Sequence, residues 1–136
     1  MEILKHKLIK LFSVAIAFGM IAMPGNAANL SDQDKKFLTS YEKVRAALVA
    51  DDLVAARTAA SELGDAGTNI VNATSLKDAR AGFETLSSRA KTLAAGRPDC
   101  HVFHCPMLKK DWVQTSTTVA NPYGGKDMVS CGKIKK

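Results

Sequence analysis

Apolar residues recur at helical spacing in the first half of the chain. Phe37, Tyr41, Val44 and Leu48 follow one another at intervals of four, three and four positions, which places them on one face of a helix. Ser31 precedes this stripe, and its hydroxyl can accept a hydrogen bond from a free backbone N–H group of the first turn. The pattern predicts a helix that begins just after Ser31.

Two more stripes follow the first. Asp51 and Asp52 interrupt the apolar pattern and can cap a second helix, and Ser75 can cap a third. A short helical turn is expected around residues 70–71. The apolar positions of the second helix are Leu53, Ala56, Ala60 and Leu63, and those of the third are Ala79, Phe83, Leu86, Ala90 and Leu93. Amphipathic helices of this length pack economically side by side, so we expect a mainly all-α fold, an antiparallel three- to four-helix bundle.

The pattern changes after Gly96-Arg97-Pro98, where β-formers and turn residues gather. Residues 101–104 and 112–119 are each expected to form a short strand, and residues 121–125 (NPYGG) carry a strong turn signal. A hairpin alone is marginally stable in water. We therefore expect this segment to lie against the bundle as an irregular or short β-hairpin appendage.

The N-terminus has the layout of a secretory signal peptide. Three lysines in the first ten residues precede an uncharged apolar run, and small residues around Ala27 suit cleavage there or one residue later. Residues 1–27 are thus predicted to be removed, leaving an exported, periplasmic protein without a membrane anchor. Residues 28–136 would then form a single domain, with the bundle in 28–97 and the appendage in 98–136.

Charge argues against a nucleic-acid partner. The chain has a formal net charge of +6. From Asn29 onward it carries 16 Lys and Arg against 12 Asp and Glu, a difference of +4. Nucleic-acid binding uses blocks of basic residues, which this chain lacks apart from a short tail.

All the soft metal ligands downstream of the signal lie in one window. Three cysteines, two histidines and two methionines occur there, between Cys100 and Cys131. Methionine usually fills cores, yet none of the three apolar stripes contains one. This clustering indicates a metal-related site in the C-terminal segment.

Local geometry selects two pairs of sulfur ligands. Pro106 favours an extended Cys105, and residues two apart on an extended chain share a side, so Cys105 and Met107 can converge. Met128 and Cys131 share a face if their segment makes a helical turn. Thiolates and thioethers select Cu(I) or Ag(I) over harder ions.

The histidines fit this site less readily. On a strand, His101 shares a face with Phe103 and Cys105, whereas His104 points the other way, so at most one imidazole is expected to join the sulfurs. A Cys₂His₂ zinc site lacks its usual spacing here. Zn(II) or Co(II) is therefore less favoured than Cu(I) or Ag(I).

A disulfide is the main alternative to a metal. In an oxidising compartment Cys105 and Cys131 can bond to each other, which would leave Cys100 unpaired. Closing a loop of about 25 residues stabilises a fold by roughly 3–4 kcal/mol on the chain-entropy model. The protein would then be a disulfide-stabilised interaction domain that binds no metal.

The sequence gives no indication of an enzyme. Its polar residues form no recognisable acid–base or nucleophile arrangement. Cys100 and Cys105 are five positions apart, not the three of a Cys-x-x-Cys redox motif.

Four motifs resemble a bacterial periplasmic domain of unknown function, DUF3347. They are ALVADDLVAAR, AGFETLSSRA, HCPMLKKDWVQ and NPYGGKDMVSCG. The family occurs alone or fused to periplasmic adaptor (membrane fusion) subunits of heavy-metal efflux systems, so the resemblance implies an exported helical domain concerned with copper, or with cobalt, zinc and cadmium. The functional positions that it implies are Cys105, Met107, Met128 and Cys131.

Two features of this chain depart from the family pattern. Gly124 stands where the family often has an aromatic residue, and Cys100, His101 and His104 lie outside the pattern. The sequence thus favours a periplasmic protein that binds Cu(I) or Ag(I) and buffers the ion or delivers it to an efflux adaptor subunit.

Overall fold

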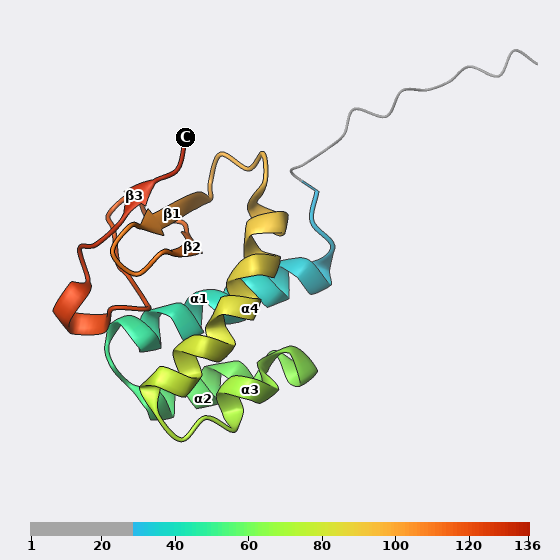
Figure 1. Cartoon of the computed structure of the whole chain (residues 1–136). Helices are drawn as coiled ribbons and strands as arrows, with labels where there is room; N and C mark the ends of the chain where they lie inside the picture. The colour runs from blue at the N-terminus through green and yellow to red at the C-terminus, as the bar shows by residue number, and fades with distance from the viewer. Residues whose placement is uncertain (1–28) are drawn as a thin grey trace, which may run out of the picture.

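A computed structural model describes residues 29–136, and the predicted signal peptide lies outside these residues. Helices occupy the first part of the described chain and a small sheet the last part (Figure 1). The helices are α1 (Asp32–Val49), α2 (Leu53–Ser61), the 3₁₀ turn η1 (Gly64–Gly67), α3 (Thr68–Val71) and α4 (Leu76–Ala94). The C-terminal elements are β1 (His101–Cys105), β2 (Lys110–Gln114), the 3₁₀ turn η2 (Gly125–Met128) and β3 (Lys133–Ile134). None of the helices in residues 29–136 is long and apolar enough to cross a membrane.

The three long helices begin at the predicted caps. The hydroxyl of Ser31 accepts a hydrogen bond from the backbone N–H of Asp34, at 3.1 Å. The carboxylate of Asp52 caps α2 and the hydroxyl of Ser75 caps α4 in the same way, at 2.8 and 3.1 Å. Each cap satisfies a backbone donor that has no partner within the helix.

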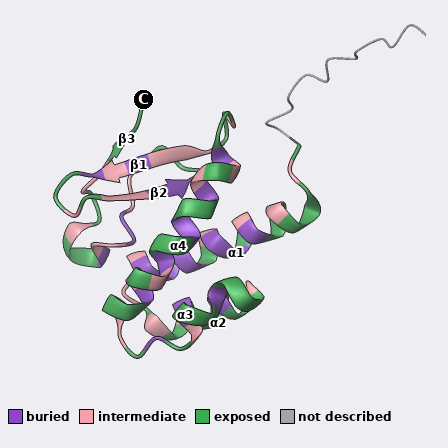
Figure 2. Ribbon diagram, turned by 45° about the vertical axis from the view of Figure 1, so that its right-hand side comes forward, coloured by how far each residue is buried: buried purple, intermediate pink, exposed green. Residues whose placement is uncertain are grey.

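The predicted stripes form the core of the helical part (Figure 2). Every predicted stripe residue of α1 is buried. The second and third stripes are buried at their alanines, at Phe83 and at Leu86, while Leu53 and Leu93 lie at the edge of the core. Leu63 also lies at this edge, beyond the end of α2 at Ser61. The rings of Tyr41 on α1 and Phe83 on α4 stack at 4.8 Å between centroids. Helix α1 contacts both α2 and α4, and α3 fills the space between α2 and α4.

The C-terminal sheet has three antiparallel strands in the order β2-β1-β3. The predicted hairpin is present, with Val102 opposite Val113 and Phe103 opposite Trp112. The structure differs from the prediction because β3 adds a third strand, and because β2 begins two residues and ends five residues earlier than expected. Strand β2 ends at Gln114 because its buried side chain donates to the carbonyls of Ser116 and Thr118 and holds those residues in a loop.

The helices and the loop after β2 contact different parts of the sheet. At the edge formed by β2, the backbone N–H of Val113 donates to the hydroxyl of Tyr41, which ties β2 to the helices. On one face of the sheet Phe103 and Trp112 stack at 5.6 Å. The loop after β2 covers this face, since an added Cβ on Gly132 would lie 2.5 Å from the Trp112 ring. The loop can pack this closely only because residue 132 is glycine.

A candidate metal site with four sulfur ligands

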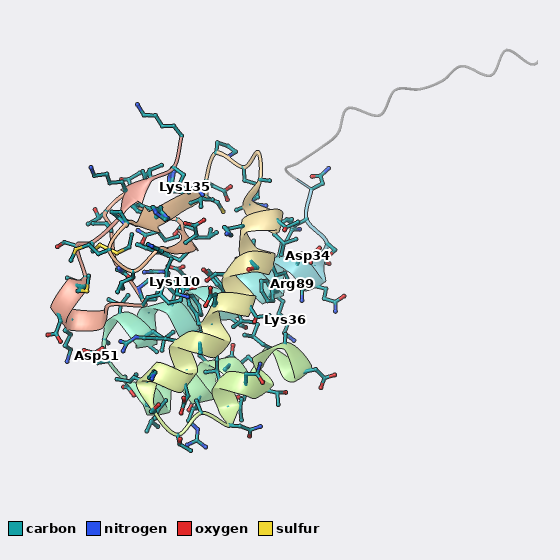
Figure 3. All side chains as sticks on the ribbon, viewed as in Figure 1. Asp34, Lys36, Asp51, Arg89, Lys110 and Lys135 are labelled. Carbon is teal, nitrogen blue, oxygen red and sulfur yellow. A yellow bond between two sulfur atoms is a disulfide. The ribbon has the colours of Figure 1, made fainter. Side chains whose placement is uncertain are left out.

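The structure joins the two predicted Met–Cys pairs through a disulfide between Cys105 and Cys131 (Figure 3). Their Cα atoms are 5.4 Å apart. Cys105 ends the central strand β1 and has no exposed surface, whereas Cys131 lies just before β3 and is half-buried. The bond therefore links the loop that covers the sheet to the middle of the sheet.

Both methionines lie beside this disulfide. An open hollow of about 530 Å³ is lined by Met107, Met128 and Cys131 together with Pro106 and Lys133. Met107, in the β1–β2 turn, is 76% exposed, and Met128, at the end of η2, is half-buried. All four sulfur residues predicted from local spacing thus meet in one place, although 26 positions separate the two cysteines.

Asn121 holds the Met128–Cys131 segment in position. Its fully buried side chain accepts hydrogen bonds from the backbone N–H groups of Tyr123 and Gly124, at 2.8 and 3.1 Å. Its amide nitrogen donates to the carbonyl of Cys131 at 2.9 Å. The turn at residues 121–125 is therefore bonded directly to the cysteine.

A second set of contacts fixes this turn to the helices. Arg80 on α4 donates to the carbonyl of Pro122 at 2.8 Å and also to the carboxylate of Asp51. Asp51 follows α1 and accepts from the backbone N–H of Lys126 as well. The hydrogen bond from Arg80 lowers the pKa of Asp51. Gly125 adopts a φ of +58° beside this pair, a conformation that favours glycine.

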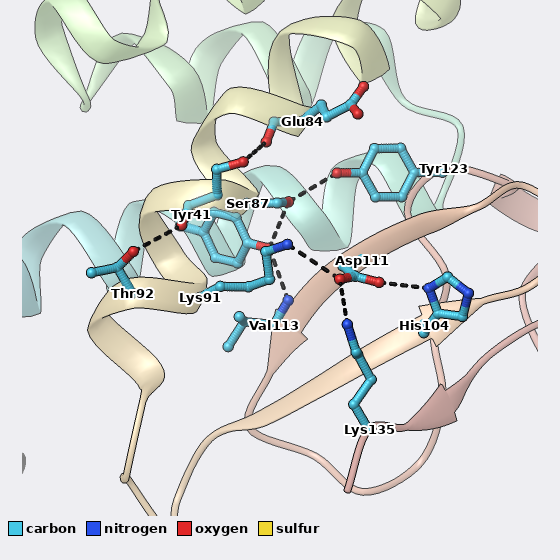
Figure 4. A network of polar contacts seen from close by, with 11 residues as sticks. Tyr41, Glu84, Ser87, Lys91, Thr92, His104, Asp111, Val113, Tyr123 and Lys135 are labelled. Atoms are coloured by element: carbon cyan, nitrogen blue, oxygen red, sulfur yellow. Dashed lines mark hydrogen bonds and ion pairs between the residues drawn. The ribbon is translucent and has the colours of Figure 1, made fainter.

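His104 lies on the opposite face of β1 from the sulfurs, as strand alternation predicts. Its Nδ1 is 2.6 Å from Oδ1 of Asp111, and the other carboxylate oxygen of Asp111 accepts hydrogen bonds from Lys91 and Lys135 (Figure 4). Burial alone would raise the pKa of Asp111, but hydrogen bonds from these three partners outweigh burial and lower that pKa to about 2. Asp111 on β2 therefore links β1 to α4 and to the residue after β3, and the structure does not bring His104 to the hollow.

His101 and Cys100 lie at the other end of β1. Cys105 lies four positions after His101 on the strand, which is about 13 Å at the rise of a β-strand. Cys100 is the free cysteine of residues 29–136, and burial raises the pKa of its thiol. The structure places neither residue beside Met107 or Met128.

A buried group of hydroxyls connects the helices to the loop behind the site. Ser87 on α4 lies 3.0 Å from the hydroxyl of Tyr41 and accepts from that of Tyr123, also at 3.0 Å (Figure 4). Burial raises the pKa of both phenols. The indole of Trp112 donates to Gln114 at 2.8 Å and packs edge-on to Tyr123. Through Ser87, these hydroxyls join the loop after β2 to α1 and α4.

Two residues that organise the structure around the site, Asn121 and Asp111, were not predicted to do so: Asn121 was expected only as part of a turn, and Asp111 was given no role. Asn121 stands before a proline within a strong turn signal, and that signal could have marked its side chain as a backbone acceptor. No local pattern identified Asp111, because its partners His104, Lys91 and Lys135 come from three separate segments of the chain.

Comparisons with protein-family models, with curated proteins and with solved structures gave no match for this chain. The relation to DUF3347 stays a prediction from its four motifs. Within residues 29–136, no three His, Cys, Asp or Glu side chains lie close enough together to hold a metal ion. A metal ion bound at the hollow would therefore need the methionine sulfurs as ligands in addition to the cysteines.

Proposed function

We propose that this protein binds Cu(I) or Ag(I) in its reduced state through Cys105, Met107, Met128 and Cys131. One observation carries the proposal: Met107, Met128 and Cys131 line a single hollow, and Cys105 is bonded to Cys131. Two thiolates and two thioethers form a soft ligand set, which suits these ions better than Zn(II) or Co(II).

The disulfide represents the metal-free state in this proposal. A cystine sulfur is not a thiolate, so the bond between Cys105 and Cys131 must be reduced before both can bind the ion. Reduction would not release the loop, because other contacts hold it. Asn121 still bonds the Cys131 carbonyl, and the N–H of Lys135 still donates to the carbonyl of Val102 at 2.8 Å.

The biological role in this proposal is periplasmic buffering of the ion or its delivery to the adaptor subunit of a heavy-metal efflux system. It follows from the predicted signal peptide and from the resemblance to DUF3347. The proposed scaffold is the antiparallel helical bundle predicted from the apolar stripes. The protein would act as a carrier and not as an enzyme.

Titration of the reduced protein with Cu(I) against a competing chelator tests this proposal. We expect one ion to bind more tightly than micromolar, and the double variant M107L/M128L to bind at least tenfold more weakly. H101A and H104A are the matched controls, and their affinities should equal that of the unmodified chain. Binding that is unchanged in M107L/M128L would contradict the proposed ligand set.

The disulfide itself favours a second function, a disulfide-stabilised interaction domain that docks on an envelope partner without metal. Cys105 is fully buried, as expected of a structural bond. Mass spectrometry of protein isolated from the periplasm separates the two functions. A complete Cys105–Cys131 bond that survives mild reductant, with no bound metal, supports the second function, whereas free thiols with bound copper or silver support the first.

A further inference from the structure

We propose that the Cys105–Cys131 disulfide is a reversible redox centre and that an external dithiol opens it by attacking Sγ of Cys131, inside the hollow lined by Met107 and Met128. The inference concerns the same cysteines as the proposed function. It does not depend on metal binding, since thiol exchange can occur whether or not the reduced protein then binds an ion.

The two sulfurs differ in their access to solvent. Cys105 has no exposed surface, because it lies in the central strand and the loop at residues 115–132 covers its face of the sheet. Cys131 is half-buried and lines the hollow of about 530 Å³. Exchange requires an attacking thiolate to reach one sulfur along the line of the S–S bond. Of the two cysteines, Cys131 is the one that the structure exposes to the hollow.

The walls of the hollow suit a thiol reagent. Met107 and Met128 give it polarisable sulfur surfaces, and both side chains can adapt their shape because they are unbranched. Asp127 and Lys133 supply one charge of each sign at its rim. A thiolate that enters the hollow is therefore close to one charge of each sign.

The exchange proceeds in two balanced steps. The thiolate of the reductant forms a bond to Sγ of Cys131, the S–S bond breaks, and its electron pair leaves on Sγ of Cys105, which takes up a proton. The second thiol of the reductant then loses its proton and attacks its own partner sulfur in the mixed disulfide. Cys131 leaves as a thiolate and is protonated in turn. The protein gains two electrons and two protons, and the dithiol becomes a disulfide.

Contacts outside the bond make the reaction reversible. The side chain of Asn121 donates to the carbonyl of Cys131. The backbone N–H of Cys131 donates to the carbonyl of Met128 at 3.0 Å. Cys105 is held by its pairing with Lys110 in the sheet. These contacts persist after reduction, so the thiols stay near each other and can bond again.

The first test compares the two thiols one at a time, in a C100S background that removes the third cysteine. C105S leaves Cys131 free, and C131S leaves Cys105 free. We expect Cys131 to react with oxidised glutathione at least tenfold faster than Cys105 in the folded proteins, and the two rates to become equal in guanidinium. Equal rates in the folded state, or a faster Cys105, would overturn the proposal.

The second test keeps the disulfide intact, so it does not depend on how the single-cysteine variants fold. In the C100S protein, K133Q should slow reduction by the anionic 2-mercaptoethanesulfonate about twofold at low salt, and D127N should speed it similarly. Reduction by neutral 2-mercaptoethanol should not change in either variant. K136Q is the control, because Lys136 does not line the hollow.

If K133Q and D127N leave both rates unchanged, or if the folded protein is not reduced at all, the proposal is wrong. Copper titration is not part of either test, so the failure of metal binding and the failure of exchange are separate results.

Discussion

Replacing Asn121 with alanine tests whether its side chain holds the sulfur site together. The variant N121A removes acceptors from the N–H groups of Tyr123 and Gly124 and the donor to the carbonyl of Cys131. Since Asn121 is fully buried, alanine leaves these groups without partners. A lost bond of this kind costs about 1 kcal/mol, so the three together should lower the free energy of unfolding by about 3 kcal/mol. For a domain of about 100 residues, this corresponds to a fall in Tm of roughly 12 °C.

Urea unfolding of the oxidised protein, followed by circular dichroism, measures this effect. The control is N69A, because Asn69 is exposed on α3, and its free energy of unfolding should stay within about 0.5 kcal/mol of the unmodified chain. If N121A costs no more than N69A, Asn121 does not hold the turn and the Cys131 segment as described.

Three further outcomes follow from the packing and charges of the fold. F83A should destabilise the oxidised protein by about 3–5 kcal/mol, because Phe83 is fully buried between Tyr41 and Tyr123, while V54A, at a 75% exposed position, should change the unfolding free energy little. R80Q should increase amide hydrogen exchange in residues 121–128, since Arg80 bonds the carbonyl of Pro122; K77Q is the control, and equal exchange in both variants would refute this role. Asp111 has a folded pKa lowered to about 2, so its contribution to stability is complete above pH 4 and lost as the pH falls towards 2. D111N should lack this part of the acid dependence in urea unfolding at several pH values, and an unchanged pH profile would contradict the contacts of Asp111.

The helices could be predicted because their signals are local. Ser31, Asp52 and Ser75 cap the helices that they precede, and the apolar stripes are buried. Strand β3 could not be predicted, since Lys133 and Ile134 are exposed and form a strand only by pairing with β1. The early end of β2 was also missed, because it depends on the contacts of one buried side chain, Gln114.

The sulfur site could be predicted in parts. Local spacing indicated the two Met–Cys pairs, and strand alternation correctly placed His104 on the face opposite Cys105. How the pairs come together depends on Asn121 and on the Asp51–Arg80 contact, which join residues far apart in the sequence. No local pattern contains that information.

The methyl groups of methionine report most directly on the central claim, that the two Met–Cys pairs form one metal site. Of the five methionines, Met107 and Met128 lie downstream of the predicted signal peptide, so the protein without residues 1–27 gives one methyl signal from each of them. With methyl-labelled methionine, Ag(I) should shift only the signals of Met107 and Met128, by equal fractions up to one ion per chain, and only after the disulfide is reduced. If neither signal moves in the reduced protein, or if both move equally in the oxidised protein, the four sulfurs do not form the site.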